Sequence, residues 1–160
     1  MTGPYRLRTA SPDDLPGMQR LFAETVRAVC SADYTDDQIR VWASSVEDGE
    51  RWRSIITRQY VVIAESGGAM AGFGSLGEGC YIDLLYVSKD HQRQGVATAI
   101  LNRLLGEAAR LGHTRLTSDV SITARPFFER HGFRVIMEQR KPFKGVKIVN
   151  YQMEKVIDPL

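Results

Sequence analysis

The chain has 160 residues, enough for one domain with its own hydrophobic core, so we expect a single domain over residues 1–160. Hydrophobic residues make up 43% of it and charged residues 25%, as in ordinary globular proteins. Its 21 basic and 19 acidic side chains give a net charge of +2, too small to indicate binding to nucleic acid or to an anionic membrane.

The cysteines and the apolar runs narrow the class further. Cys30 and Cys80 stand far apart, with no histidine at ligand spacing, which favours reduced thiols over a disulfide framework or a metal site. The N-terminus lacks a secretion-signal pattern, and no apolar run reaches the roughly 18 residues of a membrane helix. We therefore expect a soluble, cytoplasmic protein with no metal and no membrane partner.

Hydrophobic periodicity and capping residues define the elements. Ser11-Pro12 begins one helix, and a capping box of Thr35 and Gln38 begins another, while Gly112 and Gly132 end two later helices. In chain order, we expect a strand over residues 5–9, helices over 11–29, from 35 and around 52–56, strands over 60–64, 70–76 and 81–87, a helix over 96–111, a strand over 114–120, a helix over 126–130, and strands over 133–139 and 146–155.

This order is typical of a mixed α/β sandwich with one strand–helix–strand crossover near its centre. The crossover joins the strand over residues 81–87 to the helix that follows Gly95. Unpaired backbone N–H groups and the helix dipole make such a helix start an anion site. Gly95 permits close approach of a phosphate, Ala97 keeps the first turn small, and Arg93 and Thr98 add a charge and a hydroxyl. The alternative is an ordinary strand–loop–helix junction.

The spacing Gln92-x-x-Gly95-x-Ala97 resembles the pyrophosphate signature of the GNAT acetyltransferases. Ala124-x-x-Phe127-Phe128-Glu129-x-x-Gly132-Phe133 resembles a later segment of the same superfamily. The segments over residues 34–42, 81–87 and 119–133 are similar to the YafP-type branch. The resemblance implies one central, twisted, mostly antiparallel sheet of about seven strands with helices on both faces.

The same resemblance implies acetyl-CoA as cofactor and a central strand that splays from its neighbour to admit pantetheine. The backbone N–H near Leu85 would polarise the thioester carbonyl. Ser121 matches a position where the family often has a polar residue touching pantetheine. The implied cofactor-binding residues are Leu85, Tyr86, Val87, Gln92, Arg93, Gln94, Gly95, Val96, Ala97, Thr98, Ser121 and Phe128.

Direct transfer to an amine requires that the amine lose a proton, so the site needs a base or a water relay. Asp83 is the first candidate, because strand alternation places it on the same face as Leu85 and Val87, with Tyr81 to order a water. A purely structural Asp83 is the alternative. The family's usual tyrosine at the position of Phe128 protonates the departing thiolate, and phenylalanine cannot, which leaves the general acid open.

The implied function is transfer of an acetyl group to the amine of a small molecule in a ternary complex. Tyr34 and Trp42, in the part of the chain that covers the acceptor side in this family, are the expected substrate contacts, together with Asp83. The alternatives are a non-catalytic acyl-CoA-binding sensor or partner module, and a protein or peptide N-acetyltransferase. Homodimers occur in the family, so a homodimer is one expected state.

Overall fold

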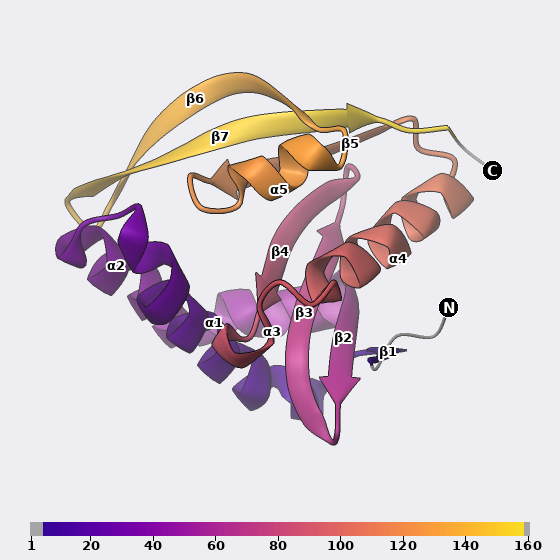
Figure 1. The fold of residues 1–160 in the computed structure, drawn as a ribbon, viewed down its shortest axis with the longest axis horizontal. Helices are drawn as coiled ribbons and strands as arrows, with labels where there is room; N and C mark the ends of the chain where they lie inside the picture. Colours follow the sequence, from indigo (N-terminus) through magenta and orange to yellow (C-terminus); the bar gives the residue numbers. More distant parts are fainter. Residues whose placement is uncertain (1–4, 159–160) are drawn as a thin grey trace.

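A computed structural model describes residues 5–158, and residues 1–4 and 159–160 lie outside the description. Its seven strands form one sheet in the order β1-β2-β3-β4-β5-β7-β6 (Figure 1), in which only β4 and β5 pair in parallel. This confirms the predicted sheet. The strands are β1 (Arg6–Thr9), β2 (Tyr60–Ser66), β3 (Ala69–Gly77), β4 (Tyr81–Val87), β5 (Arg115–Ser121), β6 (Arg134–Phe143) and β7 (Val146–Val156).

Helices cover both faces of the sheet, as the sequence predicts. One face carries α1 (Leu15–Val29), α2 (Asp36–Ala43) and α3 (Gly49–Arg58), and the other carries α4 (Val96–Arg110) and α5 (Arg125–Arg130). Alternation along β2 separates the two cores, because Val61 and Ile63 pack toward α1–α3 whereas Val62 and Ala64 pack toward α4. No helix within residues 5–158 is long and apolar enough to cross a membrane.

Close packing against β3 fixes the position of α4. A Cβ on Gly74 would lie 2.6 Å from Cγ2 of Ile100, and a Cβ on Gly72 would lie 3.0 Å from Cγ1 of Val96. Only glycine therefore lets the helix approach so closely. Ile100 and its helical neighbour Leu104 are fully buried, and each contributes about 1.5–3 kcal/mol by leaving water. This packing sets the N-terminus of α4 beside the end of β4.

Three predicted elements have different bounds in the structure. Ser11 caps a separate 3-10 turn over Pro12–Asp14 before α1, with the Ser11 backbone N–H donating to Asp14. Helix α3 is longer than residues 52–56, because Asp48 caps it and accepts from the amide of Arg51 at 3.2 Å. Strands β6 and β7 continue as a long hairpin that arches over the sheet to reach α2 (Figure 1).

Candidate active site

Strands β4 and β5 separate soon after they begin to pair. The ladder has only two registers, Tyr81 with Thr117 and Ile82 with Ser118, and the rest of β4 has no partner on this side. The hydroxyl of Ser118 donates to the carbonyl of Ile82 at 2.9 Å and so occupies the acceptor at the point of separation. The opening confirms the splayed strand that the sequence implies.

A β-bulge lies at the same place. Ser75 of β3 pairs with Leu84 and Leu76 pairs with Ile82, which leaves Asp83 as the extra residue. The Ser75 hydroxyl accepts the backbone N–H of Leu84 at 3.1 Å. The bulge interrupts strand alternation, so the prediction that Asp83 shares a face with Leu85 and Val87 is wrong. Those two pack toward α4, and the Asp83 carboxylate bonds to α3 and to Gln59 on the opposite side.

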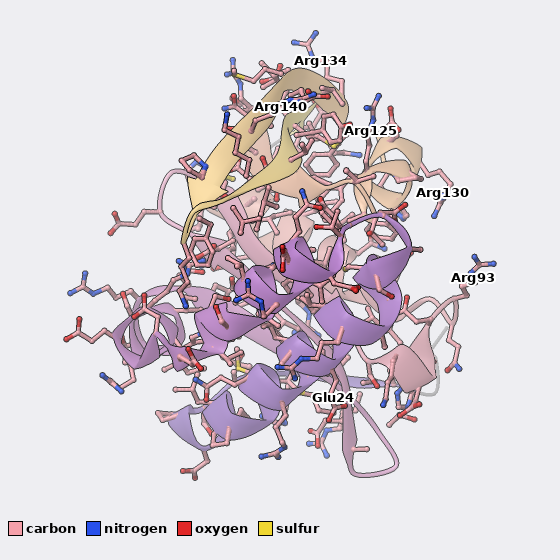
Figure 2. All side chains as sticks on the ribbon, turned by 90° about the vertical axis from the view of Figure 1, so that its left-hand side faces the viewer. Glu24, Arg93, Arg125, Arg130, Arg134 and Arg140 are labelled. Atoms are coloured by element: carbon pink, nitrogen blue, oxygen red, sulfur yellow. The ribbon has the colours of Figure 1, made fainter. Side chains whose placement is uncertain are left out.

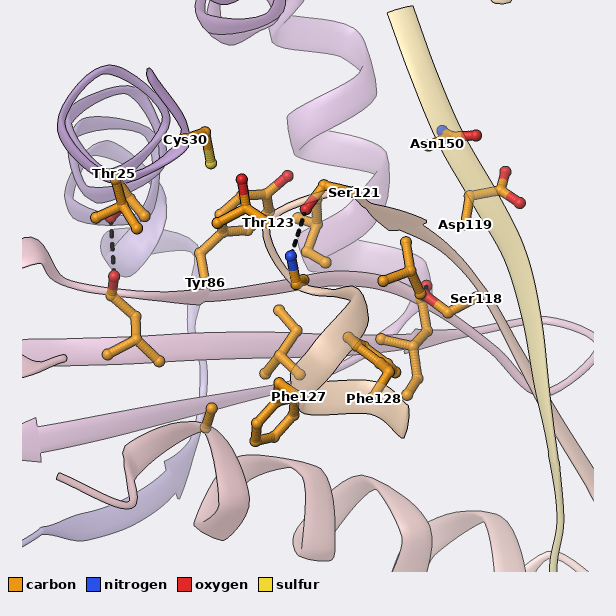
Figure 3. Close-up of a pocket in the computed structure, with 18 of the residues that line it drawn as sticks. Thr25, Cys30, Tyr86, Ser118, Asp119, Ser121, Thr123, Phe127, Phe128 and Asn150 are labelled. Atoms are coloured by element: carbon orange, nitrogen blue, oxygen red, sulfur yellow. Dashed lines mark hydrogen bonds between the residues drawn. The ribbon is translucent and has the colours of Figure 1, made fainter. Parts of the chain in front are cut away.

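The opening is part of one cavity of about 1260 Å³ that runs from the start of α4 to the underside of the β6–β7 hairpin. Figure 3 shows residues from α1, β4, β5 and α5 around it. Every predicted site residue lines this cavity except Gln94, whose side chain accepts a hydrogen bond from the Tyr5 hydroxyl at 2.5 Å. The role of Gln94 as a cofactor contact stays a prediction.

The loop before α4 has the backbone geometry of an anion site. Gly95 is the residue before the helix and has φ +84°, a conformation that glycine adopts without strain. The first intrahelical bond is donated by Ala99, so the preceding amides of the first turn have no intrahelical acceptor. A Cβ on Gly95 would meet nothing within 4 Å, so the space over these amides is open.

Two predicted phosphate contacts have other partners. The side-chain amide of Gln92 donates to the carbonyl of Val87 at 2.8 Å, which holds the loop against the end of β4. The Thr98 hydroxyl lies 3.2 Å from Nε2 of His131, and Nδ1 of the same ring lies 2.9 Å from the carbonyl of Phe127. Because a carbonyl can only accept, Nδ1 carries a proton, and Nε2 shares a hydrogen bond with the Thr98 hydroxyl.

Basic side chains surround this end of the cavity. Arg93 and Arg130 both line it, and Figure 2 shows them on the same side of the molecule. Together with the free amides of α4, they provide positive charge where a pyrophosphate would lie.

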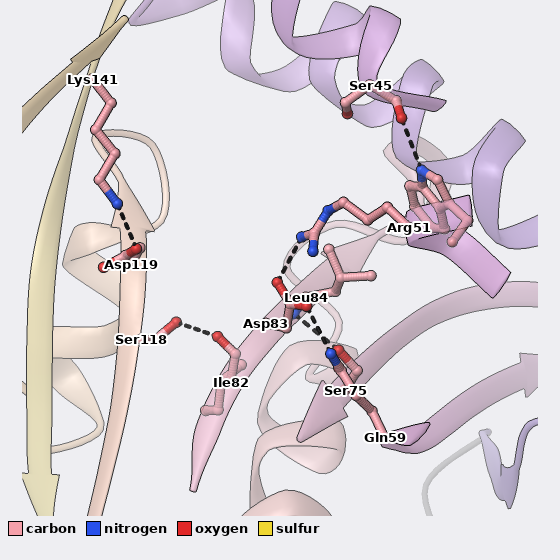
Figure 4. A network of polar contacts seen from close by, with 11 residues as sticks. Ser45, Arg51, Gln59, Ser75, Ile82, Asp83, Leu84, Ser118, Asp119 and Lys141 are labelled. Atoms are coloured by element: carbon pink, nitrogen blue, oxygen red, sulfur yellow. Dashed lines mark hydrogen bonds and ion pairs between the residues drawn. The ribbon is translucent and has the colours of Figure 1, made fainter. Parts of the chain in front are cut away.

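The other end of the cavity contains a polar network (Figure 4). The carboxylate of Asp83 accepts from Nη2 of Arg51 at 2.7 Å and from Gln59 at 2.8 Å. Across the opening, Asp119 accepts from Nζ of Lys141 and from Gln139, both at 2.9 Å. Burial alone would raise the pKa of Asp119, but these hydrogen bonds and the nearby ammonium group together lower it.

The phenols of this region stay protonated at neutral pH. Burial, with the charges of Asp119 and Asp83, raises the pKa of Tyr81 well above its usual value. Burial likewise raises the pKa of Tyr86, which packs edge-on against Phe22. Each of these groups can therefore donate a hydrogen bond into the cavity, and neither is a base near pH 7.

Tyr34 and Trp42 lie together, with ring centroids 5.2 Å apart, and both line the cavity as predicted. The Tyr34 hydroxyl is already saturated, because it donates to the carbonyl of Val149 at 2.7 Å and accepts the N–H of Ile122 at 2.9 Å. Burial raises its pKa to about 12. Tyr34 thus offers the cavity its ring only.

On the α5 side, Phe128 is 3% exposed and packs edge-on against Phe127 and Phe133. The hydroxyl of Ser121, at the end of β5, accepts the amide of Ala124 at 3.0 Å. Tyr151, on β7, stacks under Arg125 and does not line the cavity. Tyr86 does.

The sequence did not identify Arg51, Ser75, Ser118, Lys141 or His131 as parts of the site. Each acts through a partner far along the chain, and no local motif marks it. Ser75 alone of these stands out in the sequence, as a polar side chain within an otherwise apolar strand.

Comparisons with known proteins agree with this geometry. A family model for the acetyltransferase (GNAT) domain matches residues 30–155. The chain is 34% identical to the uncharacterized N-acetyltransferase YafP of Escherichia coli (strain K12) over 148 residues, which cover 92% of this chain and 93% of that protein. A GCN5-related N-acetyltransferase structure from Rhodopseudomonas palustris matches with a TM-score of 0.93 and 29% identity over 98% of both chains.

A further structure, the PaiA N-acetyltransferase of Thermoplasma acidophilum in complex with coenzyme A, matches with a TM-score of 0.78. It is 16% identical over 98% of this chain and 100% of that one, which shows a common fold. The predicted resemblance to the superfamily and to its YafP-type branch is confirmed by these matches. The chain belongs to the GNAT family of acetyltransferases.

Proposed function

We propose that the protein transfers an acetyl group from acetyl-CoA to the amine of a small molecule in a ternary complex. The observation that carries the proposal is that the unpaired part of β4 and the free amides of α4 line the same cavity. An extended chain can pair with the open strand, and an anion can bind at the helix start. These two features fit the pantetheine and pyrophosphate parts of CoA, and one structural neighbour is a complex with coenzyme A.

Acetyl-CoA supplies the acetyl group as a thioester. The amine nitrogen forms the new C–N bond to the carbonyl carbon, the C–S bond breaks, and the proton released by the amine is finally taken up by the CoA thiol. The backbone N–H near Leu85 is the proposed donor to the thioester carbonyl. Asp83 is the proposed acceptor of the amine proton, through water ordered by Tyr81, since both line the cavity on the acceptor side.

No proton donor occupies the position of Phe128, which is buried among aromatic rings. A thiol with a pKa of about 8.5 is an adequate leaving group even when it departs as the thiolate. The Tyr86 hydroxyl, protonated and at the cavity wall, is the proposed hydrogen-bond donor to that thiolate.

A small acceptor is favoured over a peptide because the hairpin closes the acceptor side. Gln38 of α2 donates to the carbonyl of Lys147 at 2.9 Å, Tyr34 to that of Val149, and Lys144 lies 2.8 Å from the hydroxyl of Ser44. These bonds hold the hairpin on α2 over the acceptor side of the cavity, and this cover favours a small molecule over an extended peptide. Both cysteines are free, which fits the reducing cytoplasm.

The first test is the melting temperature with acetyl-CoA, CoA or adenosine. Ligand at about 100 times its dissociation constant adds about 2.7 kcal/mol, or several degrees at this size. Gly95→Glu should abolish the rise. Gly112→Glu is its matched control, because Gly112 has φ +81° and open space at the other end of α4. A rise with acetyl-CoA and CoA alone supports the site, and an equal rise in Gly95→Glu would refute it.

Thiol release from acetyl-CoA, measured with and without added amines, tests the reaction. Release that depends on an amine supports the transferase. Release that is independent of any amine would indicate thioester hydrolysis, and binding without release would indicate a sensor.

A further inference from the structure

The two ion pairs on the acceptor side are arranged in the same way. In the Arg51–Asp83 pair, the arginine side chain is 49% exposed and the carboxylate 9%. In the Lys141–Asp119 pair, the lysine is 54% exposed and the carboxylate 26%. The carboxylates therefore lie behind and the cations in front, so a molecule that enters this end of the cavity meets positive charge first.

Arg51 has donors to spare. Of its five guanidinium N–H groups, the interactions within residues 5–158 use one nitrogen, Nη2, which bonds to Asp83. The buried carboxylate fixes the guanidinium in place, so its remaining edge is preorganised for a bidentate contact. Arg51 also lines a second, smaller recess of about 390 Å³ under the tip of the hairpin, which shares Ser45 and Phe143 with the main cavity. The guanidinium thus stands where the two spaces meet.

The two carboxylates that line the main cavity each already face a cation. Asp83 has Arg51 and Gln59, and Asp119 has Lys141 and Gln139. A carboxylate can accept more than two hydrogen bonds, so the amine of an acceptor can still bind to Asp83 or Asp119. An anionic group finds the unused edge of Arg51 instead.

We propose that the acceptor is a small amine that also carries a carboxylate, and that the free edge of Arg51 binds this carboxylate. The inference rests on the proposed acetyl transfer. Asp83, which holds Arg51, lies two residues before Leu85, a separation of less than about 7 Å along the strand. The residue that holds Arg51 and the proposed thioester position thus lie close together on one strand, which favours a short acceptor such as an amino acid. The aromatic and aliphatic walls formed by Trp42, Phe143 and Ile148 leave room for an apolar side chain.

The experiment compares matched acceptors that differ only in the carboxylate: a panel of L-amino acids against their C-terminal amides, and 4-aminobenzoate against 4-aminobenzamide. Thiol release gives kcat/KM at saturating acetyl-CoA for the wild type, for Arg51→Gln and for Arg53→Gln. Arg53 is exposed on the same helix and lines neither space, so its substitution is the control for loss of one positive charge.

Because amides also change the basicity of the amine, the decisive quantity is the carboxylate-to-amide ratio within each protein. We expect Arg51→Gln to lower this ratio about tenfold or more, as the loss of a charged hydrogen bond does. Arg53→Gln should leave it unchanged. The double variant Arg51→Gln/Asp83→Asn leaves no unpaired buried carboxylate, so it should keep the low ratio if Arg51 binds the carboxylate, whereas a ratio restored to the wild-type value would show that the single variant had merely lost stability.

An equal loss of rate for both members of a pair would overturn the inference, because Arg51 would then act on the site as a whole. An unchanged ratio would overturn it too. If acetyl-CoA raises the melting temperature but no amine in the panel releases thiol, the proposed transfer itself fails, and this inference fails with it. A lower ratio in Arg51→Gln and in the double variant, with no change in Arg53→Gln, supports the carboxylate site.

Discussion

The Tyr34 hydroxyl joins three parts of the chain that lie far apart in the sequence. It lies just before α2, donates to the carbonyl of Val149 on β7 and accepts the N–H of Ile122 after β5. Its side chain is at the cavity wall, yet the residue is only 7% exposed. Replacing Tyr34 by phenylalanine keeps the ring and removes both bonds, so the change isolates the hydroxyl from the packing.

The loss of stability follows from the two backbone groups that the substitution leaves without a partner, the carbonyl of Val149 and the N–H of Ile122. A buried donor and a buried acceptor each lose their partner, and an unsatisfied buried group costs about 1–3 kcal/mol. Both groups are partly buried, so we expect Tyr34→Phe to lower the free energy of unfolding by about 2–4 kcal/mol. For a chain of this length, that corresponds to a fall in melting temperature of about 5–15 °C.

Thermal unfolding followed by circular dichroism measures the effect, with Tyr60→Phe as the control. Tyr60 also sits at the start of an element, and its hydroxyl makes no hydrogen bond within residues 5–158, so its loss should change the melting temperature by about 1–2 °C at most. A similar small change in Tyr34→Phe would refute the view of Tyr34 as a structural tie. In that case its predicted role as a substrate contact would regain support.

Two further predictions concern carboxylates. Asp83→Asn should lower kcat by about 100-fold or more if Asp83 accepts the amine proton, with no change in the rise of melting temperature that acetyl-CoA causes; a rate within a few-fold of wild type would exclude that role. Asp14 is held by two hydrogen bonds from Arg8, at 2.7 and 2.8 Å, which lower its pKa. A lowered pKa in the folded state stabilises the protein above about pH 4, and this contribution is lost as the pH falls through the folded value. Asp14→Asn should therefore cost about 1–2 kcal/mol at pH 7 and progressively less as the pH falls below about 4 in urea unfolding; a loss that does not change with pH would contradict this explanation.

The elements of the fold could be predicted because their signals are local. Strand alternation, the Thr35 capping box and the glycines that end helices each act within a few residues. The anion site at Gly95 is local for the same reason, since Gly95, Ala97 and the free amides of the first turn of α4 all belong to one short stretch of the chain. Even the splayed strand was implied, through the family resemblance that this loop carries.

The bulge at Asp83 and the orientation of Arg51 could not be predicted in this way. The bulge depends on the Ser75 hydroxyl of a neighbouring strand, and nothing within β4 itself indicates an extra residue. Helix α3 carries arginines at 51, 53 and 58, which are equivalent as sequence letters. Only the position of Asp83 after the bulge selects Arg51 as the one that faces the cavity.

The opening that makes the site also weakens the sheet, because two registers alone join β4 to β5. The molecule offsets the missing ladder with bonds that cross from the α1–α2 region to the far half of the sheet: Tyr34 to Val149, Gln38 to Lys147, and Thr123 to Asp33 at 2.8 Å. These hydrogen bonds hold the two halves of the sheet together across the opening, whereas a continued β4–β5 ladder would close it. A ligand that pairs with the open edge of β4 would then complete hydrogen bonds that the fold leaves unmade, which gives it affinity without any rearrangement of the backbone.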